Sequence, residues 1–246
     1  MTKKYELVLD DTISFWGWKL FRIRALISFG SVEVGDLGGY IQKEENLSHD
    51  DNAWVSGNAK VWGNAEVWGN AKVSGNAKVW GDAEVWGNAK VWGNAEVWGN
   101  AKVSGNAKVW GDAEVWGNAK VWGDAEVWGN AKVSGNAKVW GNAKVSGNAK
   151  VWGDAKVSGN AKVWGDAEVW GNAKVSELGD IIVFKNHWSS GRHFTYTKSN
   201  KMWKVGCFYG TGQELIEKAY RDSEKSGNYY KAYVDFVETL ERLSEE

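Results

Sequence analysis

The chain has 246 residues, enough for one or two domains, and its 30 Lys and Arg against 31 Asp and Glu give a formal net charge of -1. This balance excludes a global attraction to nucleic acid or acidic membranes, and no apolar run is long enough to cross a bilayer, so no membrane partner is expected. The single cysteine, Cys207, excludes an intrachain disulfide framework, and the first residues lack the apolar run of a secretory signal, which together predict a reducing cytoplasmic location.

Residues 1–48 do not follow the repeat found further along the chain, and we predict that they form an N-terminal β cap. A short strand is expected at residues 5–9 and a longer one at residues 21–27, after a turn at residues 15–18. Ile41 and Leu47 stand six residues apart and are expected to begin the first coil. A non-repetitive cap is expected because the end of a solenoid exposes unpaired strand edges.

From Val55 to Lys174 one six-residue pattern repeats twenty times without insertion: Val, Trp or Ser, Gly, Asn or Asp, Ala, Lys or Glu. Ala and Val alternate with the charged residue and with Trp or Ser, which predicts a four-residue strand with one apolar side. Gly and Asn or Asp tolerate left-handed backbone angles and supply the corner. Three such hexads make a three-sided coil of about 18 residues, so residues 49–178 are predicted to form a parallel β-helix with only Val and Ala inside.

After Val175 the composition changes, and residues 179–246 are predicted to form a C-terminal α/β unit with a β-hairpin and two helices. Strands are expected at residues 181–184, 193–197 and 202–209. Thr211 and Glu214 have the spacing of a capping box for the first helix, and Gly227 is expected to end it. The fold class is therefore mainly β.

The outer surface of the solenoid is the predicted binding region, because its axis holds only small apolar side chains. Fourteen of the twenty hexads carry an outward Trp, and one side collects six of the predicted partner-binding residues: Trp62, Trp80, Trp98, Trp116, Trp152 and Trp170. A column of lysines is expected beside this side and completes the set: Lys102, Lys120, Lys138 and Lys156. Columns of outward indoles exceed the apolar area that soluble monomers usually expose, which predicts a protein partner or a second copy of the chain.

Other interpretations of these columns stay open. Outward indoles also stabilise a thin rod without any partner. Indoles beside lysines are typical of single-stranded nucleic-acid sites, but a lysine column also protects exposed strands from aggregation. Arginine, the better phosphate ligand, is absent from the repeat, so nucleic acid is not expected as a partner. Aromatic platforms also stack on sugar rings, which makes a carbohydrate- or surface-binding virion-associated protein an alternative.

Three possible catalytic or metal-binding arrangements are weak in the sequence. Cys207 with His187 or His193 would form a thiolate–imidazolium pair, but a small buried cysteine in a hairpin strand is the favoured interpretation. The glycines before Thr211 lack the lysine and the spacing of a phosphate-binding loop. The corner aspartates lack the spacing of calcium-binding repeats. We therefore expect no catalytic residue, no metal site and no cofactor.

The repeat Val-x-Gly-Asn-Ala-x resembles the hexapeptide-repeat, left-handed parallel β-helix superfamily, which includes the trimeric acyltransferases. The resemblance covers about half of the chain and implies a left-handed coil. No histidine occurs between Ala53 and Val175, where the catalytic base of these enzymes would be expected. The leader at residues 29–41 and 46–48, followed by hexads of this type, is more similar to phage- and prophage-encoded relatives.

These observations predict a non-enzymatic, phage-type β-solenoid in the host cytoplasm. Its outward Trp-lined sides are expected to bind a protein partner, such as a host protein, or to drive self-assembly. The alternatives are the carbohydrate- or surface-binding virion-associated protein and a diverged hexapeptide acyltransferase.

Overall fold

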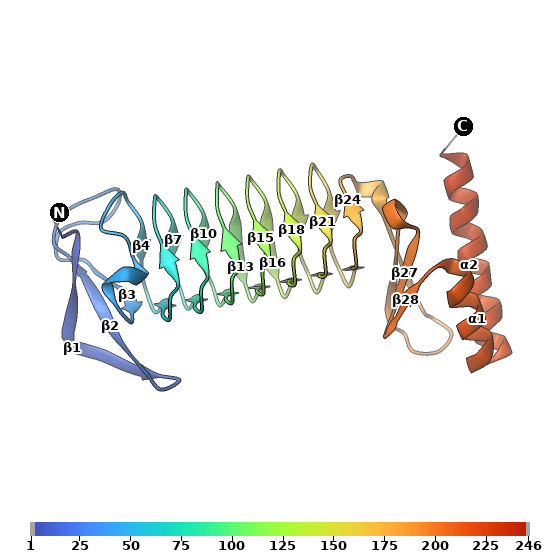
Figure 1. The fold of residues 1–246 in the computed structure, drawn as a ribbon, viewed down its shortest axis with the longest axis horizontal. Helices are drawn as coiled ribbons and strands as arrows, with labels where there is room; N and C mark the ends of the chain where they lie inside the picture. The colour runs from blue at the N-terminus through green and yellow to red at the C-terminus, as the bar shows by residue number, and fades with distance from the viewer. Residues whose placement is uncertain (1–2, 245–246) are drawn as a thin grey trace.

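The computed structural model describes residues 3–244 and shows an elongated, mainly β protein in which a parallel solenoid separates two smaller terminal units (Figure 1). Strands that pair through hydrogen bonds are three hexads apart in the sequence, as Lys90 and Val91 pair with Lys108 and Val109. Each turn therefore contains three hexads, and the predicted three-sided coil is confirmed. The antiparallel N-terminal strands and the C-terminal sheet with two helices are confirmed as well.

The solenoid has three faces, each a parallel sheet that also presents the Trp or Ser after each Val. The first face contains β5 (Lys60–Val61), β8 (Lys78–Val79), β11 (Glu96–Val97), β14 (Glu114–Val115), β17 (Lys132–Val133), β20 (Lys150–Val151) and β23 (Glu168–Val169). The second face contains β6 (Glu66–Val67), β9 (Glu84–Val85), β12 (Lys102–Val103), β15 (Lys120–Val121), β18 (Lys138–Val139), β21 (Lys156–Val157) and β24 (Lys174–Val175). The third face contains β4 (Trp54–Val55), β7 (Lys72–Val73), β10 (Lys90–Val91), β13 (Lys108–Gly111), β16 (Glu126–Gly129), β19 (Lys144–Val145) and β22 (Lys162–Val163).

Most of these strands are two residues long, so the predicted length of four was wrong except in β13 and β16. The corner begins directly after the Trp or Ser, because the following glycine already has a left-handed backbone. Gly99, for example, has φ of +68°, and a Cβ atom there would lie 3.1 Å from the backbone nitrogen of Gly117 in the next turn. Both the backbone angle and the close approach of the turns therefore require glycine.

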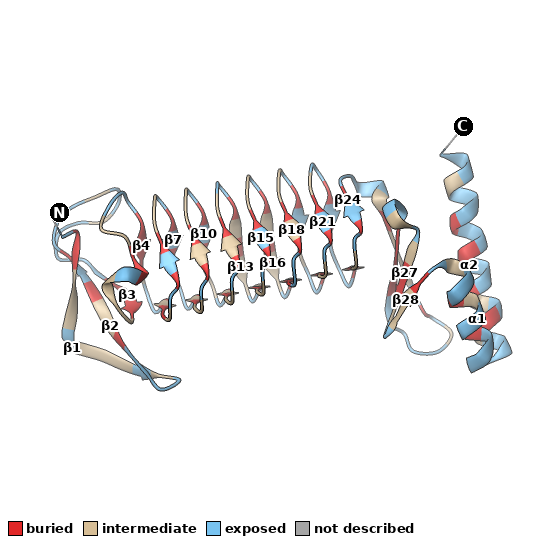
Figure 2. Ribbon diagram, viewed as in Figure 1, coloured by how far each residue is buried: buried red, intermediate tan, exposed pale blue. Residues whose placement is uncertain are grey.

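The interior of the solenoid is filled by the Val and Ala of every hexad, which are completely buried and form one continuous core along the rod (Figure 2). Removing one Val side chain from water stabilises the fold by about 1.5 to 3 kcal/mol. At the corners, asparagine side chains form ladders between turns: Asn100 Nδ2 donates to Asn118 Oδ1 over 3.2 Å. Such a ladder ends at an aspartate, as where Asn136 donates to Asp154, because a carboxylate cannot donate onward.

The N-terminal unit is a hairpin that leads into the first face. β1 (Tyr5–Phe15) and β2 (Trp18–Ala25) pair antiparallel, and β3 (Leu37–Ile41) joins the sheet of the first face. Ile41 pairs with Val61 and Leu47 with Val67, so the predicted start of the coil is confirmed. β1 runs further than the predicted residues 5–9, because an irregularity between Val8 and Thr12 lets the strand continue past its polar residues.

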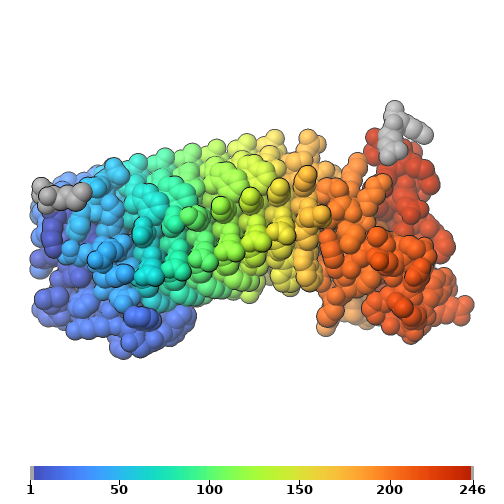
Figure 3. Space-filling model, in the orientation of Figure 1, coloured from blue at the N-terminus to red at the C-terminus, as the bar shows by residue number. Residues whose placement is uncertain are grey.

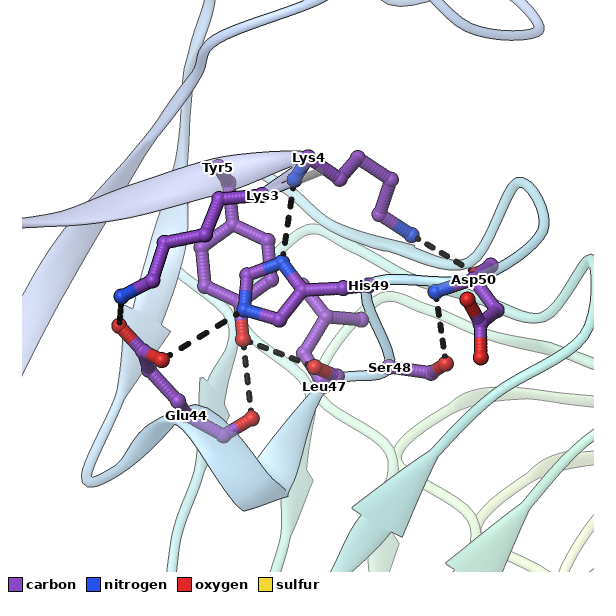
Figure 4. A network of polar contacts seen from close by, with 8 residues as sticks. All are labelled: Lys3, Lys4, Tyr5, Glu44, Leu47, Ser48, His49 and Asp50. Carbon is purple, nitrogen blue, oxygen red and sulfur yellow. Dashed lines mark hydrogen bonds and ion pairs between the residues drawn. The ribbon is translucent and has the colours of Figure 1, made fainter. Parts of the chain in front are cut away.

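The two ends of the solenoid need opposite capping groups. Backbone N–H groups donate to the carbonyls of the following turn, so the first turn leaves carbonyls unpaired and the last turn leaves N–H groups unpaired. At the first turn the ammonium group of Lys4 donates to the carbonyl of Ala53 over 2.9 Å. The Tyr5 hydroxyl donates to the carbonyl of Leu47 (Figure 4). At the last turn the N–H of Glu168 donates to the Thr195 hydroxyl over 2.9 Å.

Lys4 is only 1% exposed, and burial lowers the pKa of its ammonium group to about 8. Its backbone N–H donates to Nδ1 of His49, whose ring stacks on Tyr5 with 4.2 Å between centroids (Figure 4). Burial and the nearby carboxylate of Glu44 raise the pKa of Tyr5. This cluster of titratable groups is accounted for by the capping of the first turn.

The C-terminal unit consists of the antiparallel strands β25 (Ile181–Lys185), β26 (His193–Thr197), β27 (Met202–Val205) and β28 (Phe208–Gly210), followed by α1 (Gly212–Asp222) and α2 (Glu224–Leu243). Short 3-10 helices lie at Glu44–Asn46, Leu178–Asp180 and Lys198–Asn200. The predicted strand at residues 202–209 is divided by a turn at Gly206, where φ is +54°. The space-filling view shows this unit and the N-terminal unit at opposite ends of the rod (Figure 3).

The capping box of Thr211 and Glu214 is confirmed, since each side chain bonds the backbone N–H of the other. The prediction that Gly227 ends the first helix was wrong. Ser223 interrupts the helices and caps α2, and Gly227 lies inside α2, where a Cβ atom would lie 2.2 Å from the ring of Tyr220. Glycine is needed there for close packing of the two helices. Within residues 3–244, neither helix has the length and apolar character needed to cross a bilayer.

Candidate binding surface

The indoles of the first face lie outside the core and stack on one another along the rod. Trp80 and Trp98 have ring centroids 4.9 Å apart with planes within 4°, and Trp98 and Trp116 are 5.0 Å apart. Because each ring covers its neighbours, these indoles are about half-buried rather than open platforms. The outward direction of the Trp column is as predicted, but the column presents ring edges more than ring faces.

The terminal units cover both ends of the Trp column on the first face. At the start, the edge of Trp16 in the hairpin turn contacts Trp62 and Trp80 at 5.6 Å between centroids, and Trp62 is only 3% exposed. At the other end, Tyr209 stacks on Trp170 at 5.6 Å, and the ammonium group of Lys204 lies 4.2 Å from the centre of the same indole. Three of the six predicted Trp residues are therefore covered by the protein itself.

The charges of the first face neutralise one another. Its charged column contains four lysines and three glutamates: Lys60, Lys78, Glu96, Glu114, Lys132, Lys150 and Glu168. Three ion pairs join neighbouring turns, Lys78 with Glu96 at 2.7 Å, Lys132 with Glu114 at 2.9 Å and Lys150 with Glu168 at 3.0 Å. The first face thus has little net charge to offer a partner.

The predicted lysine column lies on the second face and not beside the Trp column of the first. Lys102 follows the corner after Trp98, and so it shares its face with Trp86, Trp122 and their neighbours. Lys102 is paired with Glu84 at 2.8 Å. Among residues 3–244, no carboxylate lies within ion-pair distance of Lys120, Lys138 or Lys156. The second face combines a lysine column that is mostly without carboxylate partners with indoles that are half-buried, like those of the first face.

The third face is also cationic, but its lysines are divided. Glu126 binds Lys108 at 3.0 Å and Lys144 at 3.3 Å in the middle of the column. At its start the N-terminal segment lies over it, where Phe29 contacts Trp54 and the hydroxyl of Ser31 accepts from Lys72. The longest uninterrupted positive surface is therefore the second face.

Sequence reasoning did not single out the interruptions of the Trp columns, although each is visible as a Ser in the Trp position. On the second face, Ser104 leaves a cavity of about 440 Å³ between Trp86 and Trp122. On the first face, Ser134 occupies the matching position but is only 6% exposed. A Ser in the Trp position leaves a gap in the indole column, which we call a notch. The notch at Ser104 on the second face is open, and the notch at Ser134 on the first face is closed.

A further cavity, of about 770 Å³, lies where the last turns meet the C-terminal sheet. His193 Nδ1 lies 2.8 Å from a carboxylate oxygen of Asp166, and Cys207 lines the same cavity. The favoured prediction of a buried Cys207 was wrong, because this residue belongs to the turn between β27 and β28 and is exposed. His187 lies elsewhere, 3.4 Å from the hydroxyl of Tyr233. Within residues 3–244, no hydrogen bond joins the Cys207 sulfur to either histidine.

The chain matches no model of a known protein family and no curated protein sequence. The class that the structure defines is a parallel β-solenoid with three hexads per turn, consistent with a hexapeptide-repeat β-helix. In the part of the chain that the structure describes, no three His, Cys, Asp or Glu side chains gather as a metal site would require.

Proposed function

We propose that this protein is a non-enzymatic binding protein that presents the second face of its solenoid to an acidic region of a protein partner. The observation that carries the proposal is the column Lys102, Lys120, Lys138, Lys156 and Lys174, in which only Lys102 has a carboxylate partner among the described residues. These lysines stand one turn apart on a rigid sheet. Fixed like charges of this kind attract an acidic surface and orient it.

The chemistry of the second face favours a different molecule over a second copy of the chain. Each solenoid face carries more lysines than glutamates, and the second face has five lysines and two glutamates in its charged column. Packing this face against any solenoid face of another copy would bring like charges together, which is unfavourable. An acidic partner protein supplies the missing charge.

The stacked indoles argue against a sugar as the main ligand. Sugar rings stack on an open aromatic face, but Trp122 and Trp140 lie 5.1 Å apart with planes within 3°, so each covers a face of the other. The indole edges and the lysine stems between them still provide apolar contact at the centre of an interface.

The resemblance of the leader and of the hexads to phage- and prophage-encoded solenoids supports a phage origin for this chain. In that setting, the acidic partner would be a host protein met in the cytoplasm, and binding would interfere with its normal contacts. A rod of stacked turns suits this role because it holds its charges at a constant spacing.

The test is charge reversal on the second face with a matched reversal on the third. The double variant Lys120→Glu/Lys138→Glu and the control Lys90→Glu/Lys162→Glu change the net charge equally. Binding of poly-L-glutamate is measured by calorimetry at low and at physiological salt. We expect at least about tenfold weaker binding in the second-face variant and a change of less than about threefold in the control. Equal weakening in both variants, or no binding by the wild-type protein, would overturn the proposal.

A further inference from the structure

The indole ladder of the second face is interrupted at Ser104, between Trp86 and Trp122, and it ends after Trp140, where Ser158 and Ser176 follow. Trp86 stacks on Trp68 with centroids 5.0 Å apart and planes within 5°, and Trp122 stacks on Trp140 in the same way. Each of these two indoles is thus supported on its outer side. On the sides that face Ser104, no indole of the described chain lies against them, and a cavity of about 440 Å³ lies between them.

We call the cavity between Trp86 and Trp122 the Ser104 slot. Its width is set by the spacing of the stacked indoles. Rings in neighbouring turns are about 5 Å apart, so Trp86 and Trp122, two turns apart, are separated by about 10 Å. A planar ring inserted midway would lie at the same distance from both indoles as the indoles do from each other elsewhere. The gap between the two indoles therefore has the thickness of one aromatic ring, stacked on both sides.

The charges around the slot define what the ring must be attached to. Lys102, Lys120 and Lys138 line it together with Glu84, which pairs with Lys102. Lys120 and Lys138 have no carboxylate partner in the described chain. An aromatic side chain with acidic residues on either side would place its ring between the indoles and its carboxylates at the ammonium groups. Buried aromatic anchors surrounded by charged rims are typical of the centres of protein interfaces.

Two other notches in the Trp columns do not offer the same slot. On the first face, Ser134 is 6% exposed, and the indole nitrogen of Trp152 beside it is buried without a hydrogen-bond partner among the described residues. On the third face, Ser146 is followed by Trp164, which is 61% exposed and has no stacking partner in residues 3–244. Among residues 3–244, only at Ser104 are both walls stacked parallel on a second indole, because Trp152 beside Ser134 is tilted by 54° against Trp170.

We propose that the Ser104 slot receives one aromatic side chain, flanked by acidic residues, from the protein partner. This inference rests on the proposed function and names the anchor of that partner. A protein anchor is favoured over single-stranded nucleic acid, because a strand of bases uses successive open stacking platforms. Here the neighbouring indoles cover one another, and a single slot accepts a single ring.

The test compares two short peptides, Glu-Glu-Phe-Glu-Glu and Glu-Glu-Leu-Glu-Glu, and the oligonucleotide dT5 by isothermal titration calorimetry. The variant Ser104→Trp fills the slot with the protein's own indole, and Ser104→Ala leaves it open. We expect the wild-type protein and Ser104→Ala to bind the phenylalanine peptide about tenfold more tightly than the leucine peptide. Ser104→Trp is expected to bind both peptides equally and to keep a wild-type circular dichroism spectrum.

The outcomes separate this inference from the proposed function. Equal affinity of the wild-type protein for the two peptides, or a phenylalanine preference that survives in Ser104→Trp, overturns the slot. If both peptides then still bind and Lys120→Glu/Lys138→Glu weakens them, the proposed function stands without the slot. If neither peptide binds, the proposed function fails as well. Tighter binding of dT5 than of either peptide, lost in Ser104→Trp, overturns the protein anchor and assigns the slot to nucleic acid.

Discussion

The first and second faces of the solenoid are built from the same hexad, yet they differ in what they leave exposed. On the first face, the indole ladder is covered at both ends and the charges pair between turns, as Lys132 does with Glu114. On the second face, Lys120 and Lys138 have no carboxylate partner in the described chain, and the notch at Ser104 is open. In a repeat protein, charge pairing and exposed surface can thus differ between faces through the order of two or three residue types.

The largest expected effect concerns the indoles themselves. Trp98 on the first face stacks on both Trp80 and Trp116, whereas within residues 3–244 Trp86 on the second face stacks only on Trp68. Trp98→Ala should lower the free energy of unfolding by about 2 to 4 kcal/mol and Trp86→Ala by about 1 to 2 kcal/mol. Urea unfolding followed by circular dichroism measures both. Equal losses would show that the two ladders contribute alike and that the faces do not divide stability as argued.

Filling the two notches tests whether one is open and the other closed. Ser104→Trp adds a ring between Trp86 and Trp122 and should raise the free energy of unfolding by about 1 to 2 kcal/mol, since it forms two new stacks. Ser134→Trp inserts the same ring at a buried position and should lower it by about 1 to 3 kcal/mol through overpacking. Thermal unfolding of the two variants side by side is the measurement. Effects of the same sign would remove the distinction between the notches.

One substitution should have opposite signs on the two faces. Lys132→Glu on the first face removes the ion pair with Glu114 and places two carboxylates together, which should cost about 0.5 to 1 kcal/mol. Lys120→Glu on the second face places a carboxylate between Lys102 and Lys138 and should stabilise the protein by about 0.3 to 1 kcal/mol. Both effects are expected to shrink in 1 M salt, as measured by urea midpoints. If both variants lose stability, the second face is not short of negative charge.

Titration with base tests the capping group at the first turn of the solenoid. Burial holds the pKa of Lys4 at about 8, below its ordinary value of 10.5, so between these values the unfolded chain binds a proton that the folded chain has released. The free energy of unfolding should therefore rise from pH 8 to pH 10. The raised pKa of Tyr5 acts in the opposite direction above pH 10, where the unfolded tyrosine ionises first.

The control for this titration is Lys4→Met, in which the rise between pH 8 and pH 10 should become smaller. Part of the rise should persist, because burial also lowers the pKa of Lys60 and of Lys204. Urea midpoints at pH 7.5, 9 and 10 measure the difference. An unchanged slope in Lys4→Met would show that the ammonium group at the first turn does not carry this dependence.

Much of the fold could be predicted from the sequence because each position of the hexad has a fixed place in the coil. The alternation around each Val and Ala defines the inside, the glycine defines the corner, and Thr211 with Glu214 defines a helix start. Errors occurred where no repeat was available. Gly227 was assigned to a helix end although its role is close packing against Tyr220, and Cys207 was assigned to a strand interior although it lies in a turn.

The candidate surface was only partly predictable. The columns were identified from residues three hexads apart, but the lysine column was placed beside the wrong indoles, since Lys102 is separated from Trp98 by a corner. Nothing in the hexads indicated that Trp16 and Tyr209, which lie far along the chain from the indoles they contact, would cover the first face. These contacts depend on how the terminal units pack against the rod.

The sequence by itself determined the coil: a period of six with Val and Ala on one side leaves no other way to bury the apolar side chains. It also determined the chemistry of every column, since each position of the hexad returns to the same face after three hexads. The tertiary structure alone decided which ladder is covered. That outcome depends on contacts between distant parts of the chain, in which Trp16 and Tyr209 of the terminal units cover the ladder of the first face and leave the notch of the second face free.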